Sequence, residues 1–204
     1  TIFLTSTFPK EGKTFISVNL ASTIALSDKK VLLLGLDIRN PKLEEYLDVP
    51  KVGITNYLAS KDHKNSADFL TKVEGFSNFY VMPTGVIPPN PAELLMGKKV
   101  GELFEKLKQE FDYIIVDTAP VSLVTDTLLI SKYADAFIYV TRANYLDKRM
   151  LTLPEKLYQE KKLPNMSILI NDTDSTKGYG YGYGYGYGYG VEVEKKSFWK
   201  RFFK

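Results

Sequence analysis

The sequence contains no cysteine, and this absence excludes several kinds of chemistry. The 204 residues include a single histidine, His63, which lies in the polar stretch 60–66 and is expected to be solvated. Disulfide frameworks, thiolate catalysis and cysteine metal sites are excluded, and histidine triads or zinc sites are not expected. A chain without thiols also suits a reducing compartment.

Strong charge and long apolar runs are lacking as well. The net charge of +3 is too small to argue for nucleic-acid binding, and no stretch is long or apolar enough to span a bilayer. The chain starts at Thr1, inside an expected strand, without an initiating Met or signal peptide, so we expect an N-terminal portion to be missing. With 44% hydrophobic residues, it can bury one α/β core.

A phosphate-binding pattern follows the β-rich run Thr1–Ser6. Residues 7–14 (TFPKEGKT) match the pattern G-x-x-x-x-G-K-[ST] except at the first position, where Thr7 replaces the usual glycine. In such a loop, backbone N–H groups bind phosphate, the lysine reaches the β- and γ-oxygens, and the hydroxyl ligates Mg²⁺. A helix expected over 15–27 directs its positive end at the same phosphates. The predicted nucleotide contacts are Thr7, Phe8, Pro9, Lys10, Glu11, Gly12, Lys13, Thr14 and Phe15.

Two acidic residues stand at the ends of apolar runs. Asp117 closes the run 113–117 (YIIVD), and Asp37 follows the run 30–36. Buried strands separated by helical segments predict a parallel sheet, in which ligands bind beyond the carboxyl ends of the strands. Lys13, Asp37 and Asp117 are therefore expected to converge. The predicted catalytic residues are Lys13, Asp37 and Asp117, and the predicted magnesium ligands are Thr14, Asp37 and Asp117.

The rest of the first 174 residues alternates between expected helices and strands. Asn90 can cap a helix that begins at Pro91, with Glu93 at capping-box spacing. Asn171, at the end of the last expected strand, is either a contact to an adenine edge or a turn residue. Further helices are expected at 53–59, 100–111 and 147–161, and further strands at 79–83, 136–141 and 166–171. The expected fold class is α/β, a three-layer P-loop NTPase fold with a mostly parallel central sheet.

Glycine and tyrosine alternate without a break from Gly178 to Gly190. Glycine at every other position leaves nothing to cover one face of a strand, so we expect a flexible ribbon that presents phenol groups to solvent. A low-complexity linker is the alternative interpretation. The expected divisions are a domain at 1–174, this tail at 175–190 and a basic aromatic segment at 191–204. The candidate phosphoacceptors are Tyr179, Tyr181, Tyr183, Tyr185, Tyr187 and Tyr189.

The last ten residues, Lys195–Lys204, combine aromatic and basic side chains. On a helical wheel, Phe198, Trp199, Phe202 and Phe203 share one face and the basic residues lie opposite. This pattern is consistent with contact to an anionic membrane surface, and equally with a frayed tail or a helix packed on the domain.

Several segments together resemble the cytoplasmic kinase domain of bacterial tyrosine kinases, the family that governs capsule and exopolysaccharide chain assembly. The matching segments are TSTFPKEGKT (5–14), LDIRNPKL (36–43), GVIPPNPAELL (85–95), FDYIIVDTAPV (111–121), Thr125-Asp126 and the tyrosine tail. The resemblance implies ATP- and Mg²⁺-dependent autophosphorylation of the tail between neighbouring subunits of a ring. It also implies a membrane-spanning co-polymerase segment, fused or separate, a tyrosine phosphatase as partner, and a place at the cytoplasmic face of the bacterial inner membrane.

The sequence departs from this family at one position. The second acidic motif of the family carries two aspartates with one residue between them, and here Gly35 stands at the first position. Glycine can neither bind Mg²⁺ nor take a proton. Asp37 is therefore expected to act alone, as a ligand of magnesium or its water, or as the acceptor of the tyrosine proton.

Two other functions are consistent with parts of the sequence. Partitioning and cell-division ATPases of the same P-loop branch carry an extra lysine early in the loop, where this chain has Phe8, and Lys10 is displaced from that position. A nucleotide-binding adaptor, phosphorylated on its tail by another kinase, is the alternative outside enzyme catalysis. The tyrosine tail favours the kinase.

Overall fold

A computed structural model describes residues 1–60 and 65–174 of the chain. By internal contacts, Thr1–Thr173 forms one unit, and Asp174–Lys204 is assigned to a second. His63, the tail tyrosines Tyr179 to Tyr189 and the segment 191–204 lie outside the described residues. What the sequence predicts for them stays a prediction.

Seven strands form a single sheet in the first unit, in the order β3-β4-β2-β5-β1-β6-β7. All neighbouring strands run parallel except β3 and β4, which are antiparallel. The expected α/β fold with a mostly parallel sheet is confirmed. The strands are β1 (Ile2–Ser6), β2 (Val31–Leu36), β3 (Thr71–Lys72), β4 (Phe79–Met82), β5 (Tyr113–Thr118), β6 (Ala136–Arg142) and β7 (Met166–Asn171).

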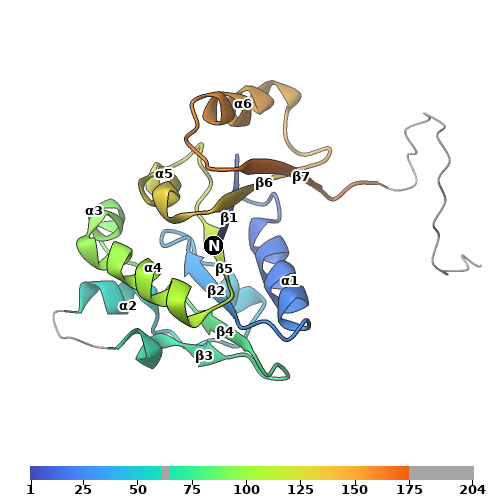
Figure 1. Ribbon diagram of the computed structural model, residues 1–204. Coiled ribbons are helices and arrows are strands. Elements are labelled where there is room, and N and C mark those ends of the chain that lie inside the picture. The colour runs from blue at the N-terminus through green and yellow to red at the C-terminus, as the bar shows by residue number, and fades with distance from the viewer. Residues whose placement is uncertain (61–64, 175–204) are drawn as a thin grey trace, which may run out of the picture. The chain divides into compact units, whose positions relative to one another are not determined.

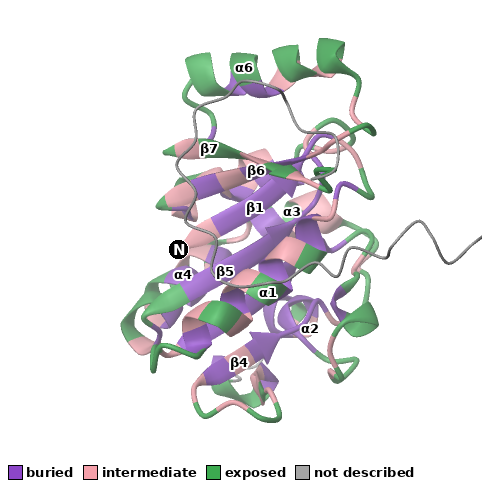
Figure 2. Ribbon diagram, turned by 90° about the vertical axis from the view of Figure 1, so that its right-hand side faces the viewer, coloured by how far each residue is buried: buried purple, intermediate pink, exposed green. Residues whose placement is uncertain are grey.

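The central strands are apolar on both faces because helices cover both sides of the sheet. Every residue of β2 is buried, as the run VLLLGL predicts for a parallel strand between two layers. Leu33 packs toward α1, whereas Leu34 packs into the cluster on the opposite face. Figure 2 shows this burial along β1 and β5, in contrast to the exposed outer surface of α6.

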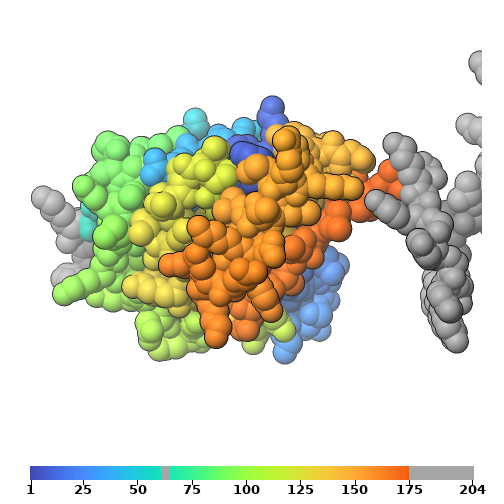
Figure 3. All heavy atoms as spheres, turned by 90° about the horizontal axis from the view of Figure 1, so that it is seen from above, coloured from blue at the N-terminus to red at the C-terminus, as the bar shows by residue number. Residues whose placement is uncertain are grey.

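The helices divide unequally between the two faces. α1 supplies Val18, Ala21 and Ala25 to one cluster, and the other helices pack on the opposite face, where α4 contributes Phe104 and Leu107. Figure 1 shows the sheet between α1 and α4. Seen from above, the residues coloured orange, which include α6, cover the middle of the surface, and residues coloured green lie to their left (Figure 3). The α-helices are α1 (Lys13–Ala25), α2 (Ile54–Ala59), α3 (Pro91–Met96), α4 (Lys98–Glu110), α5 (Asp126–Ile130) and α6 (Thr152–Gln159).

Some local expectations need correction. The helix expected at 147–161 is a 3₁₀ turn, Lys148–Leu151, followed by α6. Pro91 does start α3, but the capping box is wrong. The Asn90 side chain makes no cap bond and instead donates through Nδ2 to Glu93 Oε2 at 2.7 Å. The two side chains bond each other, so neither serves the backbone N–H groups of the first turn.

The topology brings the carboxyl ends of the six parallel strands to one edge of the sheet. β5 lies between β1 and β2, and Leu4 and Gly35 are both register partners of Asp117. On the other side of β1, Arg142 of β6 pairs in register with Asn171 of β7. Ligands of such sheets bind beyond these strand ends.

Burial predicts which aromatic substitution unfolds the protein. Phe104 is 1% exposed, and its ring centroid lies 4.9 Å from that of Tyr133 and 5.7 Å from that of Phe3. Phe104→Ala should lower the free energy of unfolding by about 3–5 kcal/mol in urea titrations, because it leaves a cavity. Tyr158→Ala, at a position 63% exposed, is the control and should change it by less than about 0.5 kcal/mol. Equal losses would contradict this assignment of the core.

Candidate active site

The loop between β1 and α1 forms an anion-binding concavity. Lys10 and Gly12 have positive φ values, 69° and 92°, which turn successive N–H groups toward one side. Among residues 1–60 and 65–174, the N–H groups of residues 10–14 find no hydrogen-bond acceptor. These groups and the N-terminal end of α1 are available to phosphate.

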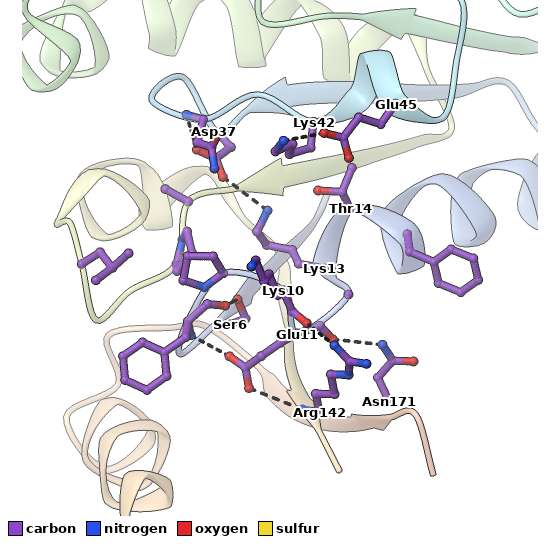
Figure 4. Close-up of a pocket in the computed structure, with 18 of the residues that line it drawn as sticks. Ser6, Lys10, Glu11, Lys13, Thr14, Asp37, Lys42, Glu45, Arg142 and Asn171 are labelled. Atoms are coloured by element: carbon purple, nitrogen blue, oxygen red, sulfur yellow. Dashed lines mark hydrogen bonds and ion pairs between the residues drawn. The ribbon is translucent and has the colours of Figure 1, made fainter. Parts of the chain in front are cut away.

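The predicted convergence of Lys13, Asp37 and Asp117 is confirmed. Lys13 Nζ lies 2.8 Å from Asp117 Oδ1 and 3.6 Å from Asp37 Oδ2. Thr14 Oγ1 donates to Asp117 Oδ2 at 2.8 Å. All four side chains are buried, so these charges interact with little screening by solvent. Figure 4 shows the Lys13 side chain between those of Asp37 and Glu11.

Burial also changes the acidity of this cluster. Desolvation raises the pKa of Asp37 above its usual value, and the positive charge of Lys13 offsets part of this rise. In the part of the chain that the structure describes, no three His, Cys, Asp or Glu side chains form a metal cage. Mg²⁺ commonly takes only one or two carboxylates and completes its shell with phosphate oxygens and water. Thr14, Asp37 and Asp117 fit such an ion, held jointly with a phosphate.

A cavity of about 740 Å³ surrounds these groups. Asp37, Lys42 and Glu45 lie on one side of it, and Arg142 and Asn171 on the opposite side (Figure 4). The predicted nucleotide contacts that line it are Phe8, Pro9, Lys10, Glu11, Gly12, Lys13, Thr14, Phe15 and Asn171.

Thr7 differs from the other predicted contacts of the loop. It is fully buried, it does not line the cavity, and its Oγ1 lies 2.9 Å from the hydroxyl of Tyr139 on β6. The side chain at the first loop position therefore packs inward and ties the loop to the sheet. Asp117 is also absent from the lining because Lys13 and Thr14 cover it.

Sequence reasoning missed several residues that line the cavity. Arg142 ends β6, so the rule that identified Asp37 and Asp117 at strand ends could have found it. Arg39 and Lys42 lie in the segment after Asp37, where no motif marks a role in the cavity. The lining residues not predicted are Ser6, Arg39, Asn40, Lys42, Glu45, Tyr46, Ala119, Pro120, Leu123, Val124, Arg142 and Asp172.

An ion pair holds the segment that carries Asp37. Arg39 Nε and Nη2 donate to the two carboxylate oxygens of Asp126 at 2.7 Å and 3.0 Å. Asp126, in the first turn of α5, is 1% exposed. A bidentate pair fixes direction as well as distance. The pair therefore anchors the backbone at Arg39, two residues after Asp37, to α5, which packs on the face of the sheet opposite to α1.

The structure explains the glycine at position 35. A Cβ built on Gly35 would lie 2.9 Å from Leu43 Cδ1 and 3.0 Å from Thr84 Oγ1. Thr84 Oγ1 also donates to the Gly35 carbonyl at 3.1 Å. An aspartate would not fit beside these side chains without displacing them. Asp37 is therefore the acidic residue that this end of β2 supplies to the cavity.

Comparisons with known proteins agree with this geometry. Residues 10–152 match the AAA domain family. The chain is 34% identical over 175 residues to the tyrosine-protein kinase CpsD of Streptococcus pneumoniae, covering 85% of this chain and 76% of that one. It is also 34% identical over 173 residues to the tyrosine-protein kinase ptk of Acinetobacter johnsonii, covering 84% of this chain and 23% of that one.

The chain belongs to the bacterial tyrosine-protein kinase family. Among solved structures, the kinase domain of the Escherichia coli tyrosine kinase ETK is 31% identical, with a TM-score of 0.75 and coverage of 90% of this chain and 71% of that one. The VpsO kinase domain is 30% identical, with a TM-score of 0.76 and coverage of 85% and 84%. A ParA family ATPase from Chlorobium tepidum, 21% identical with a TM-score of 0.68 and coverage of 86% and 76%, shows the shared P-loop fold alone.

This kinase-family chain spans different shares of its relatives. It matches three quarters of CpsD but 23% of ptk, so relatives of both lengths share the region described above. Within residues 1–60 and 65–174, no helix has the length and apolar character that crossing a bilayer requires. The P-loop NTPase fold of this region is one that binds nucleotides.

Two glycines with positive φ allow a matched test of the loop. Gly12 (φ 92°) has Asn171 Nδ2 only 2.1 Å from a built Cβ, whereas Gly75 (φ 81°) has nothing within 4 Å. Both Gly→Ala changes should strain the backbone by about 1–2 kcal/mol. Only Gly12→Ala should also displace Asn171 and weaken ATP binding, which calorimetric titration measures. If Gly75→Ala weakened ATP binding as much, the collision would not be the cause.

Glu11 predicts how the stability of this kinase-family domain depends on pH. Its side chain folds back, accepts from the Phe8 N–H at 2.6 Å and is almost fully buried. Burial raises its pKa above the usual 4.5, and hydrogen bonds from Phe8 and Arg142 N–H groups oppose this rise. The folded state therefore holds the proton more tightly than the unfolded state, and the resulting stability is lost as pH rises through the raised pKa.

Denaturant unfolding of wild type and Glu11→Gln between pH 4 and pH 7 measures this contribution. The free energy of unfolding of wild type should fall relative to that of Glu11→Gln as the pH rises above about 4.5. Glu74→Gln, at an exposed position, controls for the removal of one negative charge. A difference between wild type and Glu11→Gln that did not change with pH would contradict the prediction.

Proposed function

We propose that this protein is an ATP-dependent protein-tyrosine autokinase that phosphorylates its own tail tyrosines, Tyr179 to Tyr189. Through this reaction it regulates capsular or exopolysaccharide chain polymerisation and export. The observation that carries the proposal is Lys13, which lies between Asp117 and Asp37 and lines a cavity bordered by the phosphate-binding loop. Membership of the tyrosine-protein kinase family supports it.

The roles of the residues follow from their positions. The free N–H groups of residues 10–14 and the end of α1 bind the β-phosphate, and Lys13 Nζ leaves Asp117 to bridge the β- and γ-oxygens. Thr14 and Asp117 would hold Mg²⁺, which would neutralise charge on the phosphates. The reaction needs little covalent participation by the protein, because phosphoryl transfer depends mainly on positioning and charge neutralisation.

Asp37 is the proposed acceptor of the tyrosine proton or a ligand of magnesium-bound water. Its raised pKa makes it a stronger base than an ordinary aspartate, although a phenol of pKa about 10 remains far less acidic. In a loose transition state the proton leaves late, so a weak base suffices if it is well placed. The Arg39–Asp126 pair places it, because it holds the segment that follows Asp37.

The tail is attached close to the proposed site. Asn171 and Asp172, which line the cavity, precede Tyr179 by only a few residues. Seven extended residues span about 25 Å, so the chain length permits transfer within one molecule as well as between neighbours. The family resemblance favours transfer between subunits of a ring, and we propose that route.

The remaining partners also come from the resemblance. They are a membrane co-polymerase segment, fused upstream or separate, and a tyrosine phosphatase, with the domain at the cytoplasmic face of the inner membrane. Six phosphotyrosines would add about −9 to −12 charges and reverse the net charge of +3. Repulsion between phosphorylated tails would then separate neighbouring subunits.

Mixing two inactive variants tests transfer between molecules. Lys13→Ala keeps the tail but loses the phosphate-binding cation, and replacing the six tail tyrosines with Phe keeps the site but loses the acceptors. Each alone should incorporate almost no phosphate from Mg-ATP, whereas the mixture should label the Lys13→Ala chain. Removal of Lys13 leaves two buried carboxylates unpaired and should lower stability. That variant is therefore used only to supply the tail tyrosines that accept phosphate.

The controls separate the alternatives. Lys72→Ala, an exposed lysine outside the cavity, should label like wild type. Labelling of Lys13→Ala alone would contradict the proposed site. An unlabelled mixture, with wild type labelled, would indicate transfer within one molecule. If the wild-type protein bound ATP but incorporated no phosphate, the result would favour a nucleotide-binding adaptor whose tail is phosphorylated by another kinase.

A further inference from the structure

Every carbonyl group of the phosphate-binding loop between Ser6 and Gly12 accepts a hydrogen bond. Three consecutive carbonyls in the middle of the loop accept from side chains that come from the far end of the sequence. The Pro9 carbonyl accepts from the Tyr145 hydroxyl at 3.1 Å, the Lys10 carbonyl from Arg142 Nη1 at 3.2 Å, and the Glu11 carbonyl from Asn171 Nδ2 at 2.9 Å.

Peptide geometry links these contacts to phosphate binding. In a planar trans peptide, the carbonyl of one residue and the N–H of the next point in opposite directions. The described backbone contains no cis peptide bond. Holding the carbonyls of Pro9, Lys10 and Glu11 toward the β6–β7 side therefore directs the N–H groups of Lys10, Glu11 and Gly12 away from it. These N–H groups are among those without an acceptor.

The three donors form a connected group. Arg142 and Asn171 are register partners at the ends of β6 and β7. Arg142 Nε donates to Asp172 at 2.9 Å, and its guanidinium carbon lies 5.6 Å from the ring centroid of Tyr145. Arg142 and Asn171 are thus fixed by the ends of the two strands, and the Tyr145 ring packs against Arg142. The group can keep the loop in one shape before any ligand arrives.

We propose that Tyr145, Arg142 and Asn171 are positioning residues that preorganise the phosphate-binding N–H groups. The inference rests on the proposed function, since it concerns the same nucleotide site. It gives these residues a role toward the phosphate chain and not toward the base. Their loss should weaken every ligand that carries a diphosphate group, whatever is attached to it.

This role differs from the adenine contact that the position of Asn171 suggested. The Asn171 amide nitrogen is used by the Glu11 carbonyl, and Asn171 packs so closely that a Cβ on Gly12 would collide with it. A residue that reads adenine changes the ratio of ATP to GTP affinity and leaves pyrophosphate binding unchanged. A residue that shapes the loop lowers the affinity for all three ligands together.

Calorimetric titration with Mg²⁺ plus pyrophosphate, ATP or GTP distinguishes these roles, using the full chain. Tyr145→Phe removes one neutral hydrogen bond, so the affinity for all three ligands should fall by the same factor, about threefold to tenfold. Asn171→Ala should do the same without changing the ATP to GTP ratio. Tyr158→Phe removes an exposed hydroxyl outside the cavity and is the matched control, with affinities expected to equal those of wild type.

The outcomes are separable from those of the kinase proposal because pyrophosphate binding needs no phosphoryl transfer. Unchanged pyrophosphate affinity in both Tyr145→Phe and Asn171→Ala would overturn the inference, even if the tail is phosphorylated. A lower melting temperature with unchanged ligand affinity would show a structural role only, and would also overturn it. Parallel weakening in a protein that never labels its tail would support the inference and contradict the kinase.

Discussion

The ion pair between Lys13 and Asp117 is the interaction on which the rest of the site depends. Two carboxylates and one ammonium group are buried at the edge of the sheet, and burial of charge is costly unless each charge is paired and hydrogen-bonded. Thr14 and Ser17 satisfy Asp117 from the first turns of α1. These contacts therefore hold the helix, the loop before it and the end of β5 in one geometry.

Some of this arrangement could be predicted from the sequence because its signals are local. The apolar run before Asp117 and the glycine-lysine-threonine pattern each identify a strand end or a helix start. A parallel sheet then requires these ends to meet at one edge. Arg142 also stands at the end of a parallel strand, so the same rule predicts that it lies in the cavity, although it belongs to no known motif.

Other parts could not be predicted because they depend on contacts between distant segments. β3 has two residues and is a strand only because it pairs with β4. Asp126 has no local signal for its ion pair with Arg39, which lies 87 residues away in the sequence. The side chains of Asn90 and Glu93 have the spacing of a capping box but bond each other. Whether such side chains bond each other or the backbone N–H groups depends on their three-dimensional arrangement, which the spacing in the sequence does not specify.

The buried hydroxyl contact between Thr7 and Tyr139 has a consequence for an enzyme that acts on tyrosine. The chain has fourteen tyrosines, and the autokinase proposed above would act on the six of the tail. Tyr139 has no exposed surface, and burial raises the pKa of its phenol to about 12, against a weaker lowering by the bond to Thr7. Its phenol stays protonated, and no phosphate donor can reach it unless the centre of the sheet opens. The fold thereby keeps this tyrosine out of reach of a phosphate donor.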